Sequence, residues 1–239
     1  MRYKYETHCH SSLCSACAHS RPAELVQAYH NAGYAGMVLT DHFIHGNTAV
    51  DRRLPWEVQM RRYYAAYLEA VSAARGLDFD VIFGLEHAYG GGQEVLCYGL
   101  NLDFFLDNPS IPHLSLPDFA ALVHQHGGIL IQAHPYRYGG WEISIPTDVV
   151  DGLEVYNAGN PPQKNLMALQ KSREGSFILT SGGDTHWSGH VRPQRAGITL
   201  PYRVRDGLEL VAALKNEDHR WLVNGHATEE LTEEVLSIC

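Results

Sequence analysis

The sequence predicts an α/β fold in which parallel strands alternate with helices and form a sheet or a barrel. Strand-like and helix-like segments alternate along the 239 residues, and strands separated by helices pair in parallel through right-handed crossovers. Imidazole and carboxylate side chains follow several of these strands, at the position where barrel enzymes carry their active sites. With 45% hydrophobic residues, the chain can bury a full core as one catalytic domain over residues 1–239.

The individual elements follow from the residue pattern. Short apolar runs predict strands at 4–7, 37–40, 81–85, 129–132, 153–156 and 177–180. Apolar residues at helical spacing predict helices at 22–32, 57–75, 116–124 and 162–173. The first helix has Ser20 as its expected cap, Pro22 in its first turn and Gly33 after its end. Three glycines at 90–92 precede an expected β-hairpin arm at 93–100, and residues 201–239 are expected to close the barrel.

Charge and hydropathy exclude several classes of protein. The formal net charge is −9 and the sequence contains no Lys/Arg run, so tight binding of duplex nucleic acid is not expected. The N-terminal segment lacks the apolar region of a signal peptide, and no apolar run is long enough to span a membrane. Five cysteines, three of them between residues 9 and 17, fit reduced thiols better than a disulfide framework. We therefore expect a cytoplasmic protein, and the sequence does not specify its oligomeric state.

Residue types that bind divalent metals recur at the carboxyl ends of the predicted strands. His8 and His10 are two positions apart, so on an extended backbone both face one side and can chelate one ion. The full set is His8, His10, Asp41, His42, Glu86, His134, Asp184 and His186. Each alone has a simpler explanation, such as a helix cap for Asp41 or a solvated edge charge for Glu86. Independent accidents have no reason to fall on one rim, so the common position predicts a site for several metal ions.

In these motifs and their order, the chain resembles the polymerase and histidinol phosphatase (PHP) superfamily. The motifs are HCH at 8–10, TDH at 40–42, GLE at 84–86, AHP at 133–135 and SGGDTH at 181–186, and the resemblance extends over residues 3 to about 200. It implies a distorted (β/α)7 barrel, similar to a TIM barrel, with two or three Zn, Mn or Fe ions at the carboxyl-terminal rim of the strands. It also implies hydrolysis of phosphoesters.

The resemblance assigns the ligands by position. One ion would be bound by His8, His10, Glu86 and Asp184; Glu86 would bridge to a second ion that also binds His134; a third would take His42 and His186. Two departures from the family pattern stand out. Leu96 occupies the place of a histidine that relatives carry in the hairpin, so the second ion lacks one ligand unless His87 or a water supplies it. Alternatively, Leu96 is a core residue and the alignment with the family is shifted by one residue here.

The second departure is in the first loop. Cys17 is the nearest match there to a family histidine, with His19 as the alternative. A thiolate ligand would favour Zn or Fe at the third position. A small buried residue without a ligand role explains Cys17 equally well.

The chemistry expected of such a centre needs no protein nucleophile. Two bridged cations lower the pKa of a shared water and neutralise the phosphoryl oxygens. We expect Asp41 to orient a ligand histidine, and His186 or another rim histidine to protonate the leaving oxygen. Arg137, Arg192 and Arg195 are candidates for binding the substrate phosphate, although each alone fits a solvated loop arginine. His45 and His190 follow two ligand motifs and are candidate substrate contacts.

Three functions remain compatible with the sequence. The first is metal-dependent hydrolysis of a phosphoester in a small metabolite, such as histidinol phosphate or a nucleotide. The second is 3′–5′ exonuclease-like activity on short single-stranded nucleic acid, which the acidic charge balance disfavours. The third is a metal-binding module without turnover, a possibility raised by Leu96. The substrate, the native metal and the number of ions are not specified by the sequence.

Overall fold

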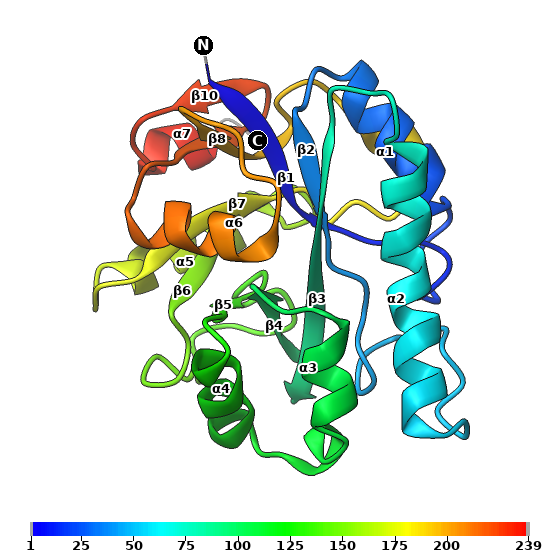
Figure 1. Cartoon of the computed structure of the whole chain (residues 1–239). Helices are drawn as coiled ribbons and strands as arrows, with labels where there is room; N and C mark the ends of the chain where they lie inside the picture. Colours follow the sequence, from blue (N-terminus) through cyan, green and yellow to red (C-terminus); the bar gives the residue numbers. More distant parts are fainter. Residues whose placement is uncertain (1, 238–239) are drawn as a thin grey trace.

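The computed structural model describes residues 2–237, which fold around one curled sheet of ten strands covered by helices (Figure 1). The strands are β1 (Tyr3–Cys9), β2 (Gly36–Leu39), β3 (Asp80–Gly90), β4 (Gln93–Tyr98), β5 (Ile129–Gln132), β6 (Gly152–Asn157), β7 (Ile178–Gly182), β8 (Ala196–Leu200), β9 (Arg220–Val223) and β10 (His226–Thr228). The helices are α1 (Pro22–Asn31), α2 (Trp56–Ala73), α3 (Leu102–Asp107), α4 (Leu116–Gln125), α5 (Pro162–Ser172), α6 (Gly207–Lys215) and α7 (Glu233–Ser237). The six strands and four helices that the sequence predicts are all confirmed, with bounds that differ by a few residues.

The sheet runs in the order β10-β9-β8-β1-β2-β3-β4-β5-β6-β7. Strands β1, β2 and β3 pair in parallel, as do β5, β6 and β7, whereas β4 is antiparallel to both of its neighbours. A parallel bridge between Cys9 and Thr185 brings the chain beyond β7 back to the end of β1. The sheet therefore curls far enough for the ends of its first and seventh strands to meet.

The alternation of strands and helices is less regular than a (β/α)7 barrel requires. Strand β3 continues beyond residue 85 to Gly90 and turns directly into β4, forming the expected hairpin. Gly90, Gly91 and Gly92 all have positive φ, which glycine adopts without the strain of a side chain. Strand β7 leads to β8 through the short 3₁₀ helix η2 (Ser188–His190). The predicted α/β fold is confirmed, its sheet is curled, and a seven-fold repeat of strand and helix is not seen.

The start of α1 differs from the prediction. Arg21, not Ser20, occupies the N-cap position, and its backbone N–H donates to the Glu24 carboxylate at 2.7 Å. The Ser20 hydroxyl oxygen instead accepts a hydrogen bond from the backbone N–H of Ser188 at 2.9 Å. Ser20 therefore joins the first loop to η2, and both segments border the rim where β1 and β7 end.

Two apolar clusters pack against the opposite faces of the sheet. The outer cluster includes Phe83, Leu85 and Val95 and fills the space beneath the helices. The inner cluster includes Tyr5, Val38, Ile82, Leu96 and Ile131, together with residues of α6 such as Leu210 and Leu214. Helix α6, in the segment that was expected to close the barrel, thus packs on the inner face. The polar residues of β1, β3 and β4 begin where this inner cluster ends.

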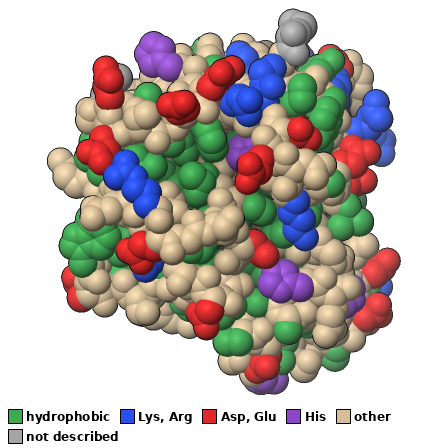
Figure 2. All heavy atoms as spheres, turned by 90° about the vertical axis from the view of Figure 1, so that its left-hand side faces the viewer, with side chains coloured by type: hydrophobic (Ala, Val, Ile, Leu, Met, Phe, Trp, Pro, Cys, Tyr) green, Lys and Arg blue, Asp and Glu red, His purple; other side chains and the backbone are tan. Residues whose placement is uncertain are grey.

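Within residues 2–237, no helix is long and apolar enough to cross a membrane. On the face shown in Figure 2, acidic and basic side chains are scattered among one another. The cytoplasmic location stays a prediction.

Candidate metal centre

The seven predicted ligands come together at one rim of the curled sheet. His8 lies in β1 and Glu86 in β3, while the other five follow the ends of β1, β2, β5 and β7: His10, His42, His134, Asp184 and His186. Their ligand atoms form three overlapping groups, and His42 and Glu86 form a fourth with Glu94; within each group all atoms lie within 4.8 Å of one another. Parallel strands of one sheet end at the same edge, which explains why residues from distant parts of the chain meet here.

Glu86 is at the centre of the cluster and is fully buried. Its Oε1 lies 2.9 Å from Nε2 of His134 and 3.3 Å from Nε2 of His8. Its Oε2 lies 2.7 Å from Nδ1 of His42 and 3.5 Å from Nε2 of His10. Burial alone would raise the pKa of Glu86, but the surrounding histidines hold it well below its usual range. The carboxylate is therefore charged, and each of its oxygens faces two imidazoles.

Asp184 forms the second acidic point of the cluster. Its Oδ1 lies 3.2 Å from Nε2 of His10 and 3.5 Å from both Nε2 of His8 and Nδ1 of His186. The residue has a positive φ of 48°, a backbone conformation that costs energy for a side chain other than glycine and is frequent at functional sites. The rings of His10 and His186 stack with centroids 4.2 Å apart.

The donor set fits divalent ions better than it fits a network of hydrogen bonds. Nε2 of His8 and Nε2 of His10 face each other at 3.0 Å, so at most one of them can carry the proton that lies between them. Among the described residues, Oε2 of Glu86 and Nδ1 of His42 are buried without a well-directed hydrogen bond, although they are 2.7 Å apart. Buried polar atoms without partners are costly. Cations coordinated by these lone pairs would remove that cost.

Asp41 supports the cluster from outside it. Its carboxylate accepts hydrogen bonds from the backbone N–H of Ser11 at 2.6 Å and from the hydroxyl of Ser15 at 2.7 Å. The Ser15 oxygen lies 3.1 Å from Nδ1 of His10. A proton on this Nδ1 leaves the lone pair of Nε2 directed into the cluster, as a metal ligand requires. Burial raises the pKa of Asp41 to about 6.

Glu154, in β6, faces Nδ1 of His8 as Ser15 faces Nδ1 of His10. The sequence-based prediction does not include it. Its Oε1 lies 2.9 Å from Nδ1 of His8. Its Oε2 accepts hydrogen bonds from the backbone N–H of His134 and the side-chain amide of Asn157, both at 2.8 Å. The available signal is a single glutamate in the middle of the apolar strand run at 153–156, since buried charges are rare without a partner.

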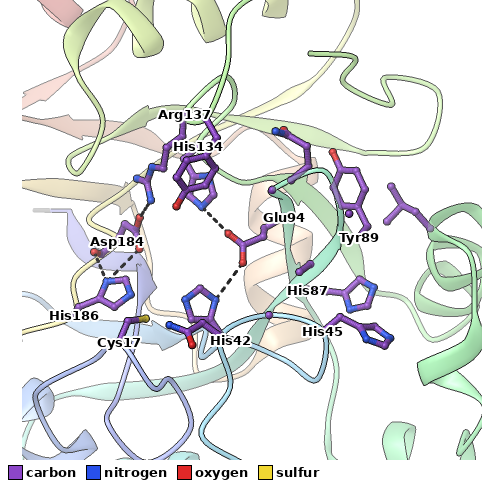
Figure 3. A pocket seen from close by; sticks show the side chains of 18 of the residues that line it. Cys17, His42, His45, His87, Tyr89, Glu94, His134, Arg137, Asp184 and His186 are labelled. Carbon is purple, nitrogen blue, oxygen red and sulfur yellow. Dashed lines mark hydrogen bonds and ion pairs between the residues drawn. The ribbon is translucent and has the colours of Figure 1, made fainter. Parts of the chain in front are cut away.

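Glu94, in β4, is a third carboxylate at the rim that the sequence analysis does not select. Its Oε1 lies 3.3 Å from Nδ1 of His42, and its Oε2 lies 3.4 Å from Nε2 of His134 (Figure 3). His87, the expected substitute ligand, points away from the cluster toward His45 and packs against Phe119 at 4.5 Å between ring centroids (Figure 3). The place next to His42 and His134 is therefore occupied by Glu94.

The first loop contributes Cys17 to the pocket. The thiol points toward His186 and His42 (Figure 3). Burial alone would raise the pKa of Cys17, but hydrogen bonds with His186 and His42 lower it to about 6. His19, the alternative, is an exposed residue whose backbone N–H donates to the carbonyl of His186. Of the two candidates, the structure brings only the Cys17 side chain to the site.

The three arginines proposed for phosphate binding have different surroundings. Arg137 lines the pocket and forms an ion pair with Asp184, while Asn157 and Asn160 accept hydrogen bonds from its guanidinium at 2.7 and 2.8 Å. Arg192 is exposed and donates to nearby backbone carbonyls. Arg195 donates to the carbonyl of Ala158 and to neighbouring loop atoms outside the pocket. Only Arg137 is therefore in reach of a molecule bound in the pocket.

A cavity of about 840 Å³ opens above the cluster. Its inner part is lined by His42, Glu94, His134, Asp184 and His186. Its outer part is lined by the β3–β4 hairpin, including His87 and Tyr89, by residues 114–116 at the start of α4, and by His45 and Tyr138. His190, the other candidate substrate contact, lies outside this lining and packs on Trp187 at 4.9 Å between ring centroids. The cavity has room for a small organic molecule with one end at the acidic and imidazole groups.

Comparisons with solved structures agree with this architecture. A two-domain protein from Bacteroides vulgatus, described as containing a predicted PHP-like metal-dependent phosphoesterase, matches with a TM-score of 0.68 at 16% identity, over 95% of this chain and 66% of that one. A candidate metal-dependent phosphoesterase from Bifidobacterium adolescentis matches with a TM-score of 0.57 at 15% identity, over 89% and 96%. Endonuclease Q, in complex with a 27-mer duplex substrate with an abasic lesion, matches with a TM-score of 0.61 at 11% identity, over 90% of this chain and 57% of that one.

These structural matches show a shared fold, and a sequence comparison identifies the family. No curated protein matches the chain. The model of the PHP domain family matches residues 6–197, which include all seven predicted ligands. This chain therefore belongs to the PHP domain family.

Proposed function

We propose that this protein is a metal-dependent hydrolase that cleaves a phosphoester bond in a small metabolite. The observation that carries the proposal is the buried Glu86 carboxylate, whose two oxygens face four imidazoles at the base of an open cavity. Such a set binds two or three divalent ions, with Zn, Mn and Fe as the candidates. We also infer that strands β1–β7 are this chain's version of the family's distorted barrel.

The protein's own residues have distinct roles in this proposal. His8, His10, His42, Glu86, His134, Asp184 and His186 hold the ions. Ions bound there supply Lewis-acid stabilisation of the phosphoryl group and an activated water. Asp41 acts through Ser15 to keep Nε2 of His10 free for coordination.

Arg137 and His186 face the substrate. Arg137 is the only Arg or Lys among the described residues that line the cavity, so it is the candidate for binding a phosphoryl oxygen. Asn157 and Asn160 fix its guanidinium in place, which reduces the entropy lost when a phosphate binds. His186 is partly exposed to the cavity, and in a centre of two ions, where it is not needed as a ligand, it is the candidate for protonating the leaving oxygen. Arg192 and Arg195 have no part in this proposal.

A nuclease activity is the second candidate. The specific observation in its favour is the fold similarity to endonuclease Q in complex with a duplex, which leaves the predicted exclusion of duplex nucleic acid unsupported. Among the described residues a single arginine lines the cavity, and this and the net charge of −9 favour a small substrate over a long polyanion.

Phosphate release from a panel of phosphoesters tests the proposal. Protein freed of metal by chelation is reconstituted with Mn²⁺, Zn²⁺ or Fe²⁺ and assayed with phosphomonoesters that include histidinol phosphate and nucleotides, and with labelled single-stranded and duplex oligonucleotides. We expect release from at least one small ester, with Arg137→Gln raising KM at least about tenfold. Arg192→Gln, which removes an exposed arginine outside the cavity, is the matched control. Metal-loaded protein that cleaves none of these substrates would instead be a binding module without turnover.

A further inference from the structure

Glu94 lies at a point of the metal centre where the sequence leaves a ligand unaccounted for. It belongs to the antiparallel strand β4 and is paired with Ala88 of β3, two residues beyond Glu86 toward the rim. The residue is 8% exposed. Its two oxygens point to two different histidines, one on each side (Figure 3). A carboxylate in this position is built into the cluster and is accessible from the cavity.

The surrounding histidines do not have enough protons to satisfy both carboxylates. Nε2 of His134 lies 2.9 Å from Glu86 and 3.4 Å from Glu94. Nδ1 of His42 lies 2.7 Å from Glu86 and 3.3 Å from Glu94. An imidazole N–H points in one direction and can serve one of the two acceptors well. A cation among these four groups interacts favourably with all of them.

A separate observation indicates that a positive ion is expected at this place. Among residues 2–237, Oε2 of Glu86 and Nδ1 of His42 are buried atoms that lack a well-directed hydrogen bond. Both belong to the group formed with Glu94, whose ligand atoms all lie within 4.8 Å of one another. The nearby guanidinium of Arg137 is engaged with Asp184, Asn157 and Asn160, so it does not neutralise Glu94.

Leu96 cannot supply the ligand, and its surroundings explain why. Leu96 is paired directly with Glu86 across β3 and β4, so both side chains face the inside of the curled sheet. It is fully buried in the inner apolar cluster with Ile82 and Ile131. Because side chains alternate along a strand, Glu94 faces the same side as Leu96 but lies one layer closer to the rim. Leu96 thus belongs to the apolar layer beneath the site, and the side chain of Glu94 reaches the site from the rim.

We propose that Glu94 is a metal ligand which, with His42, Glu86 and His134, makes one end of the centre rich in carboxylates. The inference rests on the proposed metal dependence and deepens it. The adjoining group, which shares His42 and adds His10 and His186 with Cys17 beside them, offers imidazoles and a thiol. Carboxylates suit Mn²⁺, whereas imidazole and thiolate suit Zn²⁺ and Fe²⁺. The ion at the Glu94 end is therefore expected to be the one for which Mn²⁺ competes best.

Equilibrium dialysis of the chelated full-length protein against Mn²⁺ alone and Zn²⁺ alone tests the proposal, with Mn²⁺ also followed by electron paramagnetic resonance. The variant Glu94→Gln keeps the shape and removes the charge. We expect it to bind one Mn²⁺ at least about tenfold more weakly than the natural protein. Glu94→His should restore binding at this position but favour Zn²⁺ over Mn²⁺ relative to the natural protein. The control is Glu57→Gln, on the exposed side of α2.

Each outcome separates this inference from the proposed function. Natural protein that binds Mn²⁺ while Glu94→Gln binds it equally well would show that Glu94 is only a hydrogen-bond acceptor, and the phosphoesterase proposal would stand. Loss of one Mn²⁺ in the variant supports the inference even if no phosphoester is cleaved. Natural protein that binds neither metal would overturn both. Circular dichroism and the melting temperature of each variant distinguish a lost ligand from a lost fold.

Discussion

The substitution Glu154→Gln tests whether ligand orientation depends on a carboxylate outside the metal cluster. In the native structure, Oε1 accepts from Nδ1 of His8, and Oε2 accepts from the backbone N–H of His134 and the amide of Asn157. Three N–H groups thus face two acceptor oxygens. A glutamine offers one oxygen and one NH₂ group, so at least one N–H must face another donor.

Either orientation of the glutamine disturbs a proposed metal ligand, His8 in one case and His134 in the other. If the NH₂ group faces His8, the imidazole proton moves to Nε2 and the lone pair needed by the ion is lost. If the NH₂ group faces the other side, the backbone of His134 and the amide of Asn157 both lose a buried acceptor, at about 1–3 kcal/mol for each unsatisfied group. We expect metal affinity to fall about 10- to 100-fold, equivalent to about 1.4–2.7 kcal/mol.

Competition with a chromophoric chelator measures this change directly. Chemical unfolding of the chelated protein gives the accompanying loss of stability, and Glu57→Gln, whose side chain is exposed, is the control for loss of one negative charge. Metal affinity within about twofold of the natural protein would refute the argument, since neither the tautomer of His8 nor the position of His134 would then depend on Glu154.

Three further predictions concern other parts of the site. Glu86→Gln should lower turnover at least about a hundredfold and reduce bound metal, because it removes the charge that faces four imidazoles. Near-normal hydrolysis and metal content would show that Glu86 is needed for neither. Leu96→Ala should lower the free energy of unfolding by about 2–5 kcal/mol without loss of metal, and lost metal at unchanged stability would show a role in the centre. In chelated protein, the rate of Cys17 alkylation should reach half its maximum near pH 6, because the pKa of Cys17 is lowered to about 6 and the thiolate, present above that pH, is the reactive form. Peptide mapping after iodoacetamide treatment measures this rate. A half-maximum near pH 8.5–9, as for an ordinary thiol, would contradict the prediction.

The positions of the predicted ligands could be read from the sequence because a simple rule of topology orders them. Residues that follow parallel strands meet at one edge, so His42, His134 and Asp184 needed only the location of the preceding apolar run. The same rule located Arg137 no better than Arg192, because both follow ligand motifs in loops. Loop paths depend on tertiary contacts, and Arg137 is directed inward by Asn157 and Asn160.

Glu94 and Glu154 were not predicted because their roles depend on strand register. Glu94 faces the site only because β3 and β4 pair Glu86 with Leu96, and a slip of one residue would turn it to the opposite face. Glu154 lies inside a strand whose pattern is otherwise apolar. The apolar run around Glu154 marks it as a buried charge but does not identify its partner, so the pairing of strands must be known before its function can be inferred.

The buried acids explain why this rim requires cations for more than catalysis. Glu86 and Asp184 have pKa values held well below the usual range, so both are charged at neutral pH. Arg137 neutralises Asp184 directly, but the charge of Glu86 is balanced in the ion-free protein by histidines that must then be protonated. The pKa of His134, raised to about 9 by Glu86 and Glu94 against the effect of burial, reflects this demand. Metal ions displace such protons when they bind. The carboxylate that would bridge the ions therefore also determines how much their binding raises the free energy of unfolding.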